Sequence, residues 1–109
     1  MMDGQGDLSS VFAILANDDR LALLRELLKR HNTQSAGASI TTLAELAGVS
    51  RFSASRHLHL MRAVGLVVVE RRGPSAIHRL DTSRFEEIDG WLYPFLDEAT
   101  KSPPSAGES

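Results

Sequence analysis

The chain has 109 residues, of which 42% are hydrophobic and 24% are charged, and this is the composition of one small globular domain. It contains no cysteine, no apolar run that approaches the roughly 18 residues of a membrane span, and no signal peptide, so we expect a cytoplasmic protein without disulfides or thiolate metal sites. The formal net charge is −2, but residues 51–80 carry six basic and one acidic side chain, whereas residues 81–109 carry two basic and seven acidic ones.

The N-terminal part of the chain contains two predicted helices. Residues 1–7 are small and polar, and we expect them to be disordered. Residues 8–15 place apolar side chains at helical spacing and predict a short amphipathic helix. Asn17 is a suitable N-cap for a second helix, which runs to about Arg30 and has a predicted buried face of Leu21, Leu24, Leu27 and Leu28. The polar stretch 31–39 predicts a loop.

A helix-turn-helix is predicted in the middle of the chain. Thr42 and Glu45 have the spacing of a capping box, which indicates that a third helix begins at Thr42. The buried side of this helix is predicted to consist of Leu43, Leu46 and Ala47. Gly48 is predicted to end the third helix, and Ser50 is a suitable N-cap for a fourth.

The fourth predicted helix begins after Ser50 and closes at Gly65, a residue suited to a left-handed C-cap. One apolar stripe at helical spacing consists of Ala54, Leu58, Met61 and Val64. The other faces carry guanidinium, hydroxyl and imidazole groups and no carboxylate: Arg51, Ser53, Ser55, Arg56, His57, His59 and Arg62. Arginines and short polar groups opposite a buried stripe suit the major groove of DNA, so we predict a recognition helix, with Arg56 as the strongest candidate for a base contact.

The next segment predicts a β-hairpin. Leu66–Val69 is rich in β-branched residues, Gly73–Ser75 has the composition of a turn, and Ala76–Leu80 is predicted to return as the second strand. Arg71 and Arg72 lie beside the turn, where a winged helix contacts DNA phosphates or the minor groove. A hairpin edge that charge protects from aggregation is a second interpretation, and the two are compatible.

Residues 83–99 predict a last helix, which Pro94 should kink or split. Its aromatic, apolar face needs a covering surface, which is either the domain's own core or a second subunit. We predict a homodimer in which this helix pairs together with the first one, through Leu8, Val11, Phe12, Phe85, Ile88, Trp91, Leu92, Phe95 and Leu96. Residues 100–109 are expected to form a disordered tail.

These elements predict one mainly α domain over residues 8–99, a winged helix-turn-helix of about five helices and a two-stranded wing. Its segments LANDDRLALLRELL, TTLAELAGVSRFSASRHLHLMRAVGLVVVERRG and IHRLD resemble the ArsR family of bacterial winged helix-turn-helix regulators. The most specific part of the resemblance is AELAGVSRFSASRHLHLMRAVGLV.

The resemblance implies a homodimer that pairs through its first and last helices and represses transcription by occupying a promoter. By matched position, the residues that would face double-stranded DNA are Arg51, Ser53, Ser55, Arg56 and His57, with Arg71 and Arg72 on the wing. The predicted DNA-binding set also includes Thr42, Ser50 and Arg62. Two recognition helices related by a two-fold axis would require an inverted-repeat operator with half-sites about 34 Å apart.

The sequence departs from the family in its lack of metal ligands. Many members bind metals through cysteines, or through Asp and His on the last helix, whereas this chain has no cysteine and its last helix has no histidine. His57 and His59 would point about 200° apart on one helix. We therefore predict no metal site and no cofactor, and the sequence leaves open whether a small-molecule effector binds.

The two alternatives to DNA binding are an enzyme and a protein-interaction module. An enzyme is not expected, because the chain has no glycine-rich phosphate loop, no nucleophile motif and no metal cluster. A winged helix that serves only as a protein-interaction or dimerisation module would present acidic or apolar side chains on its fourth helix. The fourth helix instead presents Arg51, Arg56 and Arg62, which favours a DNA-binding regulator.

Overall fold

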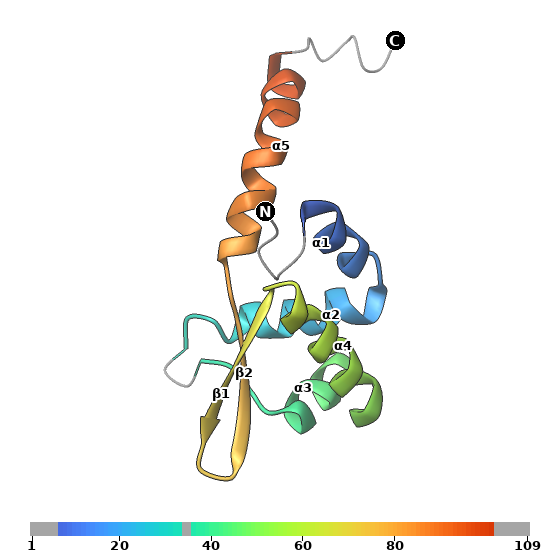
Figure 1. The fold of residues 1–109 in the computed structure, drawn as a ribbon, viewed down its shortest axis with the longest axis vertical. Coiled ribbons are helices and arrows are strands. Elements are labelled where there is room, and N and C mark those ends of the chain that lie inside the picture. Colours follow the sequence, from blue (N-terminus) through green and yellow to red (C-terminus); the bar gives the residue numbers. More distant parts are fainter. Residues whose placement is uncertain (1–6, 34–35, 102–109) are drawn as a thin grey trace.

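The computed structural model describes residues 7–33 and 36–101, which form a winged helix-turn-helix (Figure 1). The elements are α1 (Leu8–Leu15), α2 (Asp18–Lys29), α3 (Ile40–Ala47), α4 (Arg51–Ala63), β1 (Val67–Arg72), β2 (Ser75–Leu80) and α5 (Ser83–Lys101). The predicted architecture of five helices and one hairpin is therefore confirmed. None of the helices described is long and apolar enough to cross a membrane.

The boundaries of the folded part differ slightly from the prediction. Asp7 is the N-cap of α1, since its side chain accepts a hydrogen bond from the amide of Ser10, and α5 continues to Lys101. The predicted disorder of residues 1–6 and 102–109 lies outside the described residues.

The helix caps confirm two predictions and correct a third. Asn17 and Ser50 cap α2 and α4, each by accepting a hydrogen bond of 3.0 Å from the amide three residues later. The predicted capping box of Thr42 and Glu45 is wrong, because α3 begins at Ile40. Ser39 is in the extended conformation required of a cap, and its Oγ accepts a hydrogen bond of 3.2 Å from the amide of Thr42.

A tight glycine turn ends each of the two helices of the helix-turn-helix. Gly48 and Gly65 have φ angles of 75° and 83°, in the left-handed region that glycine adopts without strain. After α4, the amide of Leu66 donates to the carbonyl of Met61 at 2.9 Å, and the amide of Gly65 donates to the carbonyl of Arg62 at 3.1 Å. This is the Schellman pattern, so the predicted left-handed closure at Gly65 is confirmed.

The hydrophobic core lies among α2, α3, α4 and the base of the hairpin. The predicted stripe of α4 is buried throughout: Ala54, Leu58, Met61 and Val64. On α2 the predicted face is partly wrong, since Leu23, Leu24 and Leu27 are buried while Leu21 and Leu28 are exposed. On α3, Leu46 is exposed and Ala44 is buried instead. At about 100° per residue, Leu21 and Leu28 share one flank of α2, roughly 100° away from the buried centre.

The wing is an antiparallel hairpin whose register runs from Val67 opposite Leu80 to Arg72 opposite Ser75. A short piece of the predicted 31–39 loop joins it, because the backbones of Ala38 and His78 exchange two hydrogen bonds, of 2.8 and 3.0 Å. Gly37 precedes this bridge with a φ of 92°. A Cβ atom there would overlap the carbonyl oxygen of His78, so the close approach depends on glycine.

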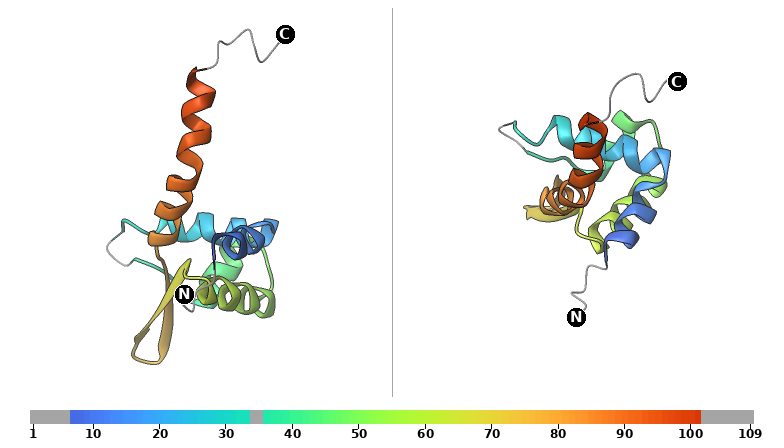
Figure 2. Two further views of the ribbon diagram at one scale, coloured as in Figure 1. Left: turned by 45° about the horizontal axis from the view of Figure 1, so that its top comes forward. Right: turned by 90° about the horizontal axis from the view of Figure 1, so that it is seen from above.

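Helix α5 leaves the body of the domain, at the end opposite the wing (Figures 1 and 2). Pro94 lies inside α5, which is one continuous helix, so the predicted splitting does not occur. Buried Arg84 anchors its base by donating from Nε to the carbonyl of Val64 at 2.9 Å and from Nη1 to Glu87 at 2.7 Å. Further along, Trp91 packs edge-on against Phe12 of α1.

Candidate nucleic-acid interface

The outward ridge of α4 consists of Phe52, Arg56 and His59. These residues are four and three positions apart, so their side chains follow one another along one face of the helix. All three are exposed, on the side of the helix opposite the buried stripe. Because α4 packs its other side against the core, this ridge is free to enter a groove of DNA.

One flank of the ridge adds further hydrogen-bond donors. Arg51, Ser55 and Arg62 are exposed and are spaced four and seven positions apart, which places them on a common line along the helix. No acidic residue occurs in α4. This part of the surface therefore combines positive charge with short hydroxyl groups, which is the combination that binds phosphates and base edges.

Four of the predicted DNA-facing residues also make contacts within the domain. The hydroxyl of Ser50 caps α4 by accepting a hydrogen bond from the backbone amide of half-buried Ser53. Half-buried Thr42 lies in the first turn of α3, where its hydroxyl accepts a hydrogen bond from Ser39. His57 points toward α2, with a side chain only 15% exposed. His57 therefore takes part in a contact within the domain, and its contact with DNA stays a prediction.

His57 is held by two residues of α2. Its Nδ1 accepts a hydrogen bond of 3.1 Å from Nε of Arg20, and its Nε2 lies 3.8 Å from a carboxylate oxygen of Asp19. Burial lowers the pKa of His57 below its usual 6.5, and the charge of Arg20 lowers it further, against the smaller opposing effect of Asp19. The ring is therefore a neutral acceptor that helps to fix α4 on α2.

The two arginines of the wing differ in their surroundings. Successive residues of a strand point to opposite faces, so Arg71 and Arg72 project in different directions. Arg72 pairs with Glu70 at 3.3 Å, and Glu70 also pairs with Arg79 at 3.1 Å. The hydrogen bond from Arg72, with its charge, lowers the pKa of the Glu70 carboxyl. Arg71 is exposed and faces the helices.

Two adjoining hollows connect α3, α4 and the wing. One, of about 450 Å³, is lined by Ile40, Arg51, Phe52 and Ser55. The other, of about 420 Å³, is lined by Ser39, Ile40, Thr41, Arg51, Arg71, Pro74, Ser75 and Ala76. Arg51 and Arg71 thus approach the second hollow from the recognition helix and from the wing. A phosphate group at this point would meet both guanidinium groups.

Helical periodicity did not identify two functional residues: Phe52 on the exposed ridge of α4, and Arg20, which holds His57. Phe52 is not among the predicted DNA-binding residues, although its spacing of four from Arg56 places it on the exposed ridge. Arg20 was not detected because it contacts His57 across 37 positions of sequence, and no local pattern reveals such a contact. Within residues 7–33 and 36–101, no three histidine, aspartate or glutamate side chains are grouped so that they could hold a metal ion.

Comparison with known proteins identifies a helix-turn-helix domain and similar transcriptional regulators. Residues 15–70, just over half of the chain, match a family model described as a helix-turn-helix domain. The chain is similar to the HTH-type transcriptional regulator NmtR of Mycobacterium tuberculosis, with 31% identity over 86 residues that cover 78% of this chain and 67% of that protein.

Two solved structures share the fold. An ArsR-like transcriptional regulator from Rhodococcus sp. RHA1 is 29% identical, with a TM-score of 0.68 and coverage of 86% of this chain and 83% of that one. The second structure is described as the homodimeric winged helix-turn-helix DNA-binding domain of a possible ArsR-family regulator from Mycobacterium bovis. It is 23% identical, with a TM-score of 0.63 and coverage of 92% of this chain and 94% of that one.

Proposed function

Because the chain belongs to the ArsR family of winged helix-turn-helix DNA-binding transcriptional regulators, we propose that it is a repressor that occupies an inverted-repeat operator as a homodimer. The observation that carries the proposal is the placement of two unlike surfaces. The basic recognition helix and wing lie toward one end of the molecule, and an acidic helix with exposed aromatic side chains projects from the other (Figure 1).

The DNA-binding half of the proposal rests on α4 and the wing. The exposed ridge of α4 enters the major groove, with Arg56 in position to donate two hydrogen bonds to a guanine. Arg51 and Arg71 bind the backbone phosphate that occupies the hollow between them. Arg62 and Ser55 extend the contacts along the flank of α4. Arg72 contributes less, because Glu70 already neutralises part of its charge.

The dimer half of the proposal rests on exposed apolar groups along α5: Trp91, Tyr93, Phe95 and Leu96. Trp91 lies between Phe12 and Phe95, edge-on to the first ring and tilted against the second, at centroid distances of 5.4 and 4.9 Å, and this aromatic cluster continues onto α1. Val11 is removed from the predicted interface because it is fully buried in its own chain. Phe85 and Ile88 pack partly against the core, at the base of the same helix.

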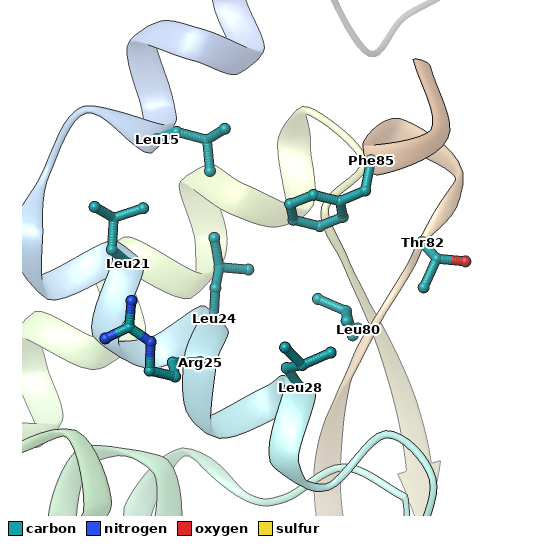
Figure 3. Close-up of a pocket in the computed structure, with 8 residues that line it drawn as sticks. All are labelled: Leu15, Leu21, Leu24, Arg25, Leu28, Leu80, Thr82 and Phe85. Carbon is teal, nitrogen blue, oxygen red and sulfur yellow. The ribbon is translucent and has the colours of Figure 1, made fainter. Parts of the chain in front are cut away.

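An apolar groove beside α5 supplies a matching concave surface (Figure 3). Its volume is about 360 Å³, and side chains of α1, α2, β2, α5 and the β2–α5 connection surround it: Leu15, Leu21, Leu24, Arg25, Leu28, Leu80, Thr82 and Phe85. Leu28 is 59% exposed at its edge, an unfavourable position for leucine in a free chain. Leu21 and Leu28 thus join the proposed interface.

Antiparallel pairing of two α5 helices brings the exposed apolar side chains of one helix to the groove of the partner. Helix α5 is about 28 Å long, and if two copies cross near Leu92, then Leu96 of one copy lies opposite Ile88 of the other. The exposed end of each α5 then meets the partner's groove near Phe85. Among the described residues that line the groove, Arg25 alone is charged. It suits Asp97 and Glu98 near the end of the partner's α5, which pair with Lys101 in the single chain.

Protection mapping on the DNA upstream of the protein's own coding sequence tests the proposal. We expect two protected half-sites, related by a two-fold axis and about one DNA turn apart. We also expect transcription from that promoter in vitro to fall as the protein is added. Protection without an inverted repeat would contradict the operator, and increased transcription would contradict repression.

A further inference from the structure

The most exposed large apolar side chain among the described residues lies on the recognition helix. Phe52, the second residue of α4, is 74% exposed. It takes no part in the aromatic cluster of Phe12, Trp91 and Phe95, which belongs to α1 and α5. A phenyl ring in water is unfavourable, so its position on a DNA-facing ridge suggests an apolar group on the DNA.

The major groove of DNA offers one such group, the 5-methyl of thymine. We propose that Phe52 binds a thymine methyl group in each half-site and thereby specifies that base pair. The inference rests on the proposed DNA-binding function and adds a base preference that the arginines do not provide. The first turn of a recognition helix commonly contacts base edges, and Phe52 lies in that turn.

The surroundings of Phe52 fit this ligand. The adjacent hollow has an apolar side from Ile40 and Phe52 and a polar side from Arg51 and Ser55. A thymine presents both characters in the major groove, since its methyl group lies beside the O4 acceptor. The methyl can therefore contact the phenyl ring while Ser55 donates a hydrogen bond to the O4 of the same thymine.

The helix geometry also predicts where the thymine lies. Phe52 and Arg56 are one turn apart on the same ridge, which separates them by about 6 Å along the helix axis. Base pairs are about 3.4 Å apart, so the thymine should lie about two steps from the base pair that Arg56 reads.

Replacing single thymines by deoxyuridine tests the assignment, because deoxyuridine pairs in the same way but lacks the methyl group. Binding of the full-length protein to the mapped operator is measured with each thymine replaced symmetrically in both half-sites. Loss of one buried methyl should weaken binding about fourfold per half-site, and this should occur at one position, about two base pairs from the Arg56 contact. The Phe52→Ser variant should bind the thymine and deoxyuridine operators equally well.

A matched variant, Leu46→Ser, removes an exposed apolar side chain from α3 and should keep the full discrimination between the two operators. A thermal melt of each variant shows that the fold is retained, which is expected since both side chains are exposed. Discrimination that persists in Phe52→Ser, or a wild-type protein indifferent to every replacement, overturns the role of Phe52. Failure of the wild-type protein to bind any inverted repeat would instead overturn the proposed function.

Discussion

The Nε–H of Arg20 on α2 donates a 3.1 Å hydrogen bond to Nδ1 of His57 on the recognition helix. Arg20 also donates from Nη1 to the carbonyl of Ile14 at 3.0 Å, so one side chain connects the end of α1 with α2 and α4. Since α1 belongs to the proposed dimer interface, this contact is a direct structural link between dimerisation and the orientation of the recognition helix.

The link between Arg20 and His57 predicts a specific pH dependence. Burial and the charge of Arg20 lower the folded-state pKa of His57. Asp19 raises it by a smaller amount, and Arg56 lowers it slightly. At a pH near these pKa values, the unfolded chain therefore binds more protons than the folded one. Stability from the neutral ring is therefore complete above the unfolded pKa of about 6.5 and is lost as the pH falls from there toward the lowered folded pKa. Thermal melts of the wild type and of His57→Gln check this.

We expect the wild type to lose stability relative to His57→Gln between about pH 7.5 and about pH 5. His78, whose pKa is also lowered chiefly by burial, is present in both proteins and cancels in the comparison. His59→Gln is the matched control, an exposed histidine on the same helix. A stability difference that stays constant over this pH range would contradict the role of the contact.

Arg56→Ala should weaken specific binding by about 1–3 kcal/mol and relax the preference at one base pair, because a guanidinium that bonds a guanine would be lost. Binding to a set of operators with single base changes measures both effects. Lys29→Ala on α2 removes the same charge away from the recognition helix and should leave the base preference intact. If Arg56→Ala weakened specific and non-specific binding equally, Arg56 would contact a phosphate and not a base.

The two wing arginines should differ in the salt dependence of binding. Arg71→Ala should lower the slope of log affinity against log salt concentration by about 0.9, the value for one lost phosphate contact. Arg72→Ala should have a smaller effect, because its guanidinium is paired with Glu70. Titrations at several salt concentrations decide this, and an unchanged slope for Arg71→Ala would show that the wing does not contact DNA.

Leu96→Glu and Leu28→Glu should each convert the dimer to monomer, since either change places an unpaired carboxylate in the proposed interface. Both leucines are exposed in the single chain, so neither substitution should unfold it. Leu46→Glu, at an equally exposed site on α3, is the control and should remain dimeric. Sedimentation at micromolar concentration gives the answer. If Leu28→Glu stayed dimeric while Leu96→Glu became monomeric, α5 would form the interface and the groove would not.

Gly37→Ala should destabilise the fold by about 1–3 kcal/mol, because a Cβ atom there would overlap the backbone of His78 and the φ of 92° disfavours alanine. Urea unfolding measures the loss. Gly90→Ala is the matched change, since a Cβ atom on that helical glycine meets open space, and it should stabilise by about 0.5–1 kcal/mol. If Gly37→Ala left the free energy of unfolding unchanged, the close packing of residues 36–39 against the wing would be contradicted.

Local sequence patterns were sufficient for most of the fold. The stripe of α4, the caps at Asn17 and Ser50 and the closing Gly65 all depend on residues within a few positions of one another, so periodicity and capping rules find them. The start of α3 was misplaced because Thr42 and Glu45 imitate a capping box, whereas the cap that forms is Ser39.

The site was harder to predict because it depends on contacts between distant segments. By its position in the recognition helix, His57 was predicted to face DNA. In the structure its side chain contacts Arg20 and Asp19 of α2. Glu70 pairs with Arg72 and makes the two wing arginines unequal, which their adjacent positions do not show. Leu28 lies on the predicted buried face of α2, and it is exposed because α1, α2, β2 and α5 leave a groove between them.

The central claim, that two copies of this chain bind one operator through two recognition helices, is tested most directly by the helical phase of the half-sites. Affinity is measured for the mapped operator and for a version with five base pairs inserted at its centre, which turns one half-site by about half a turn of DNA. We expect binding of the inserted operator to fall to the level of an isolated half-site. Equal affinity for the two operators would contradict the claim, because each half-site would then be bound by an independent monomer.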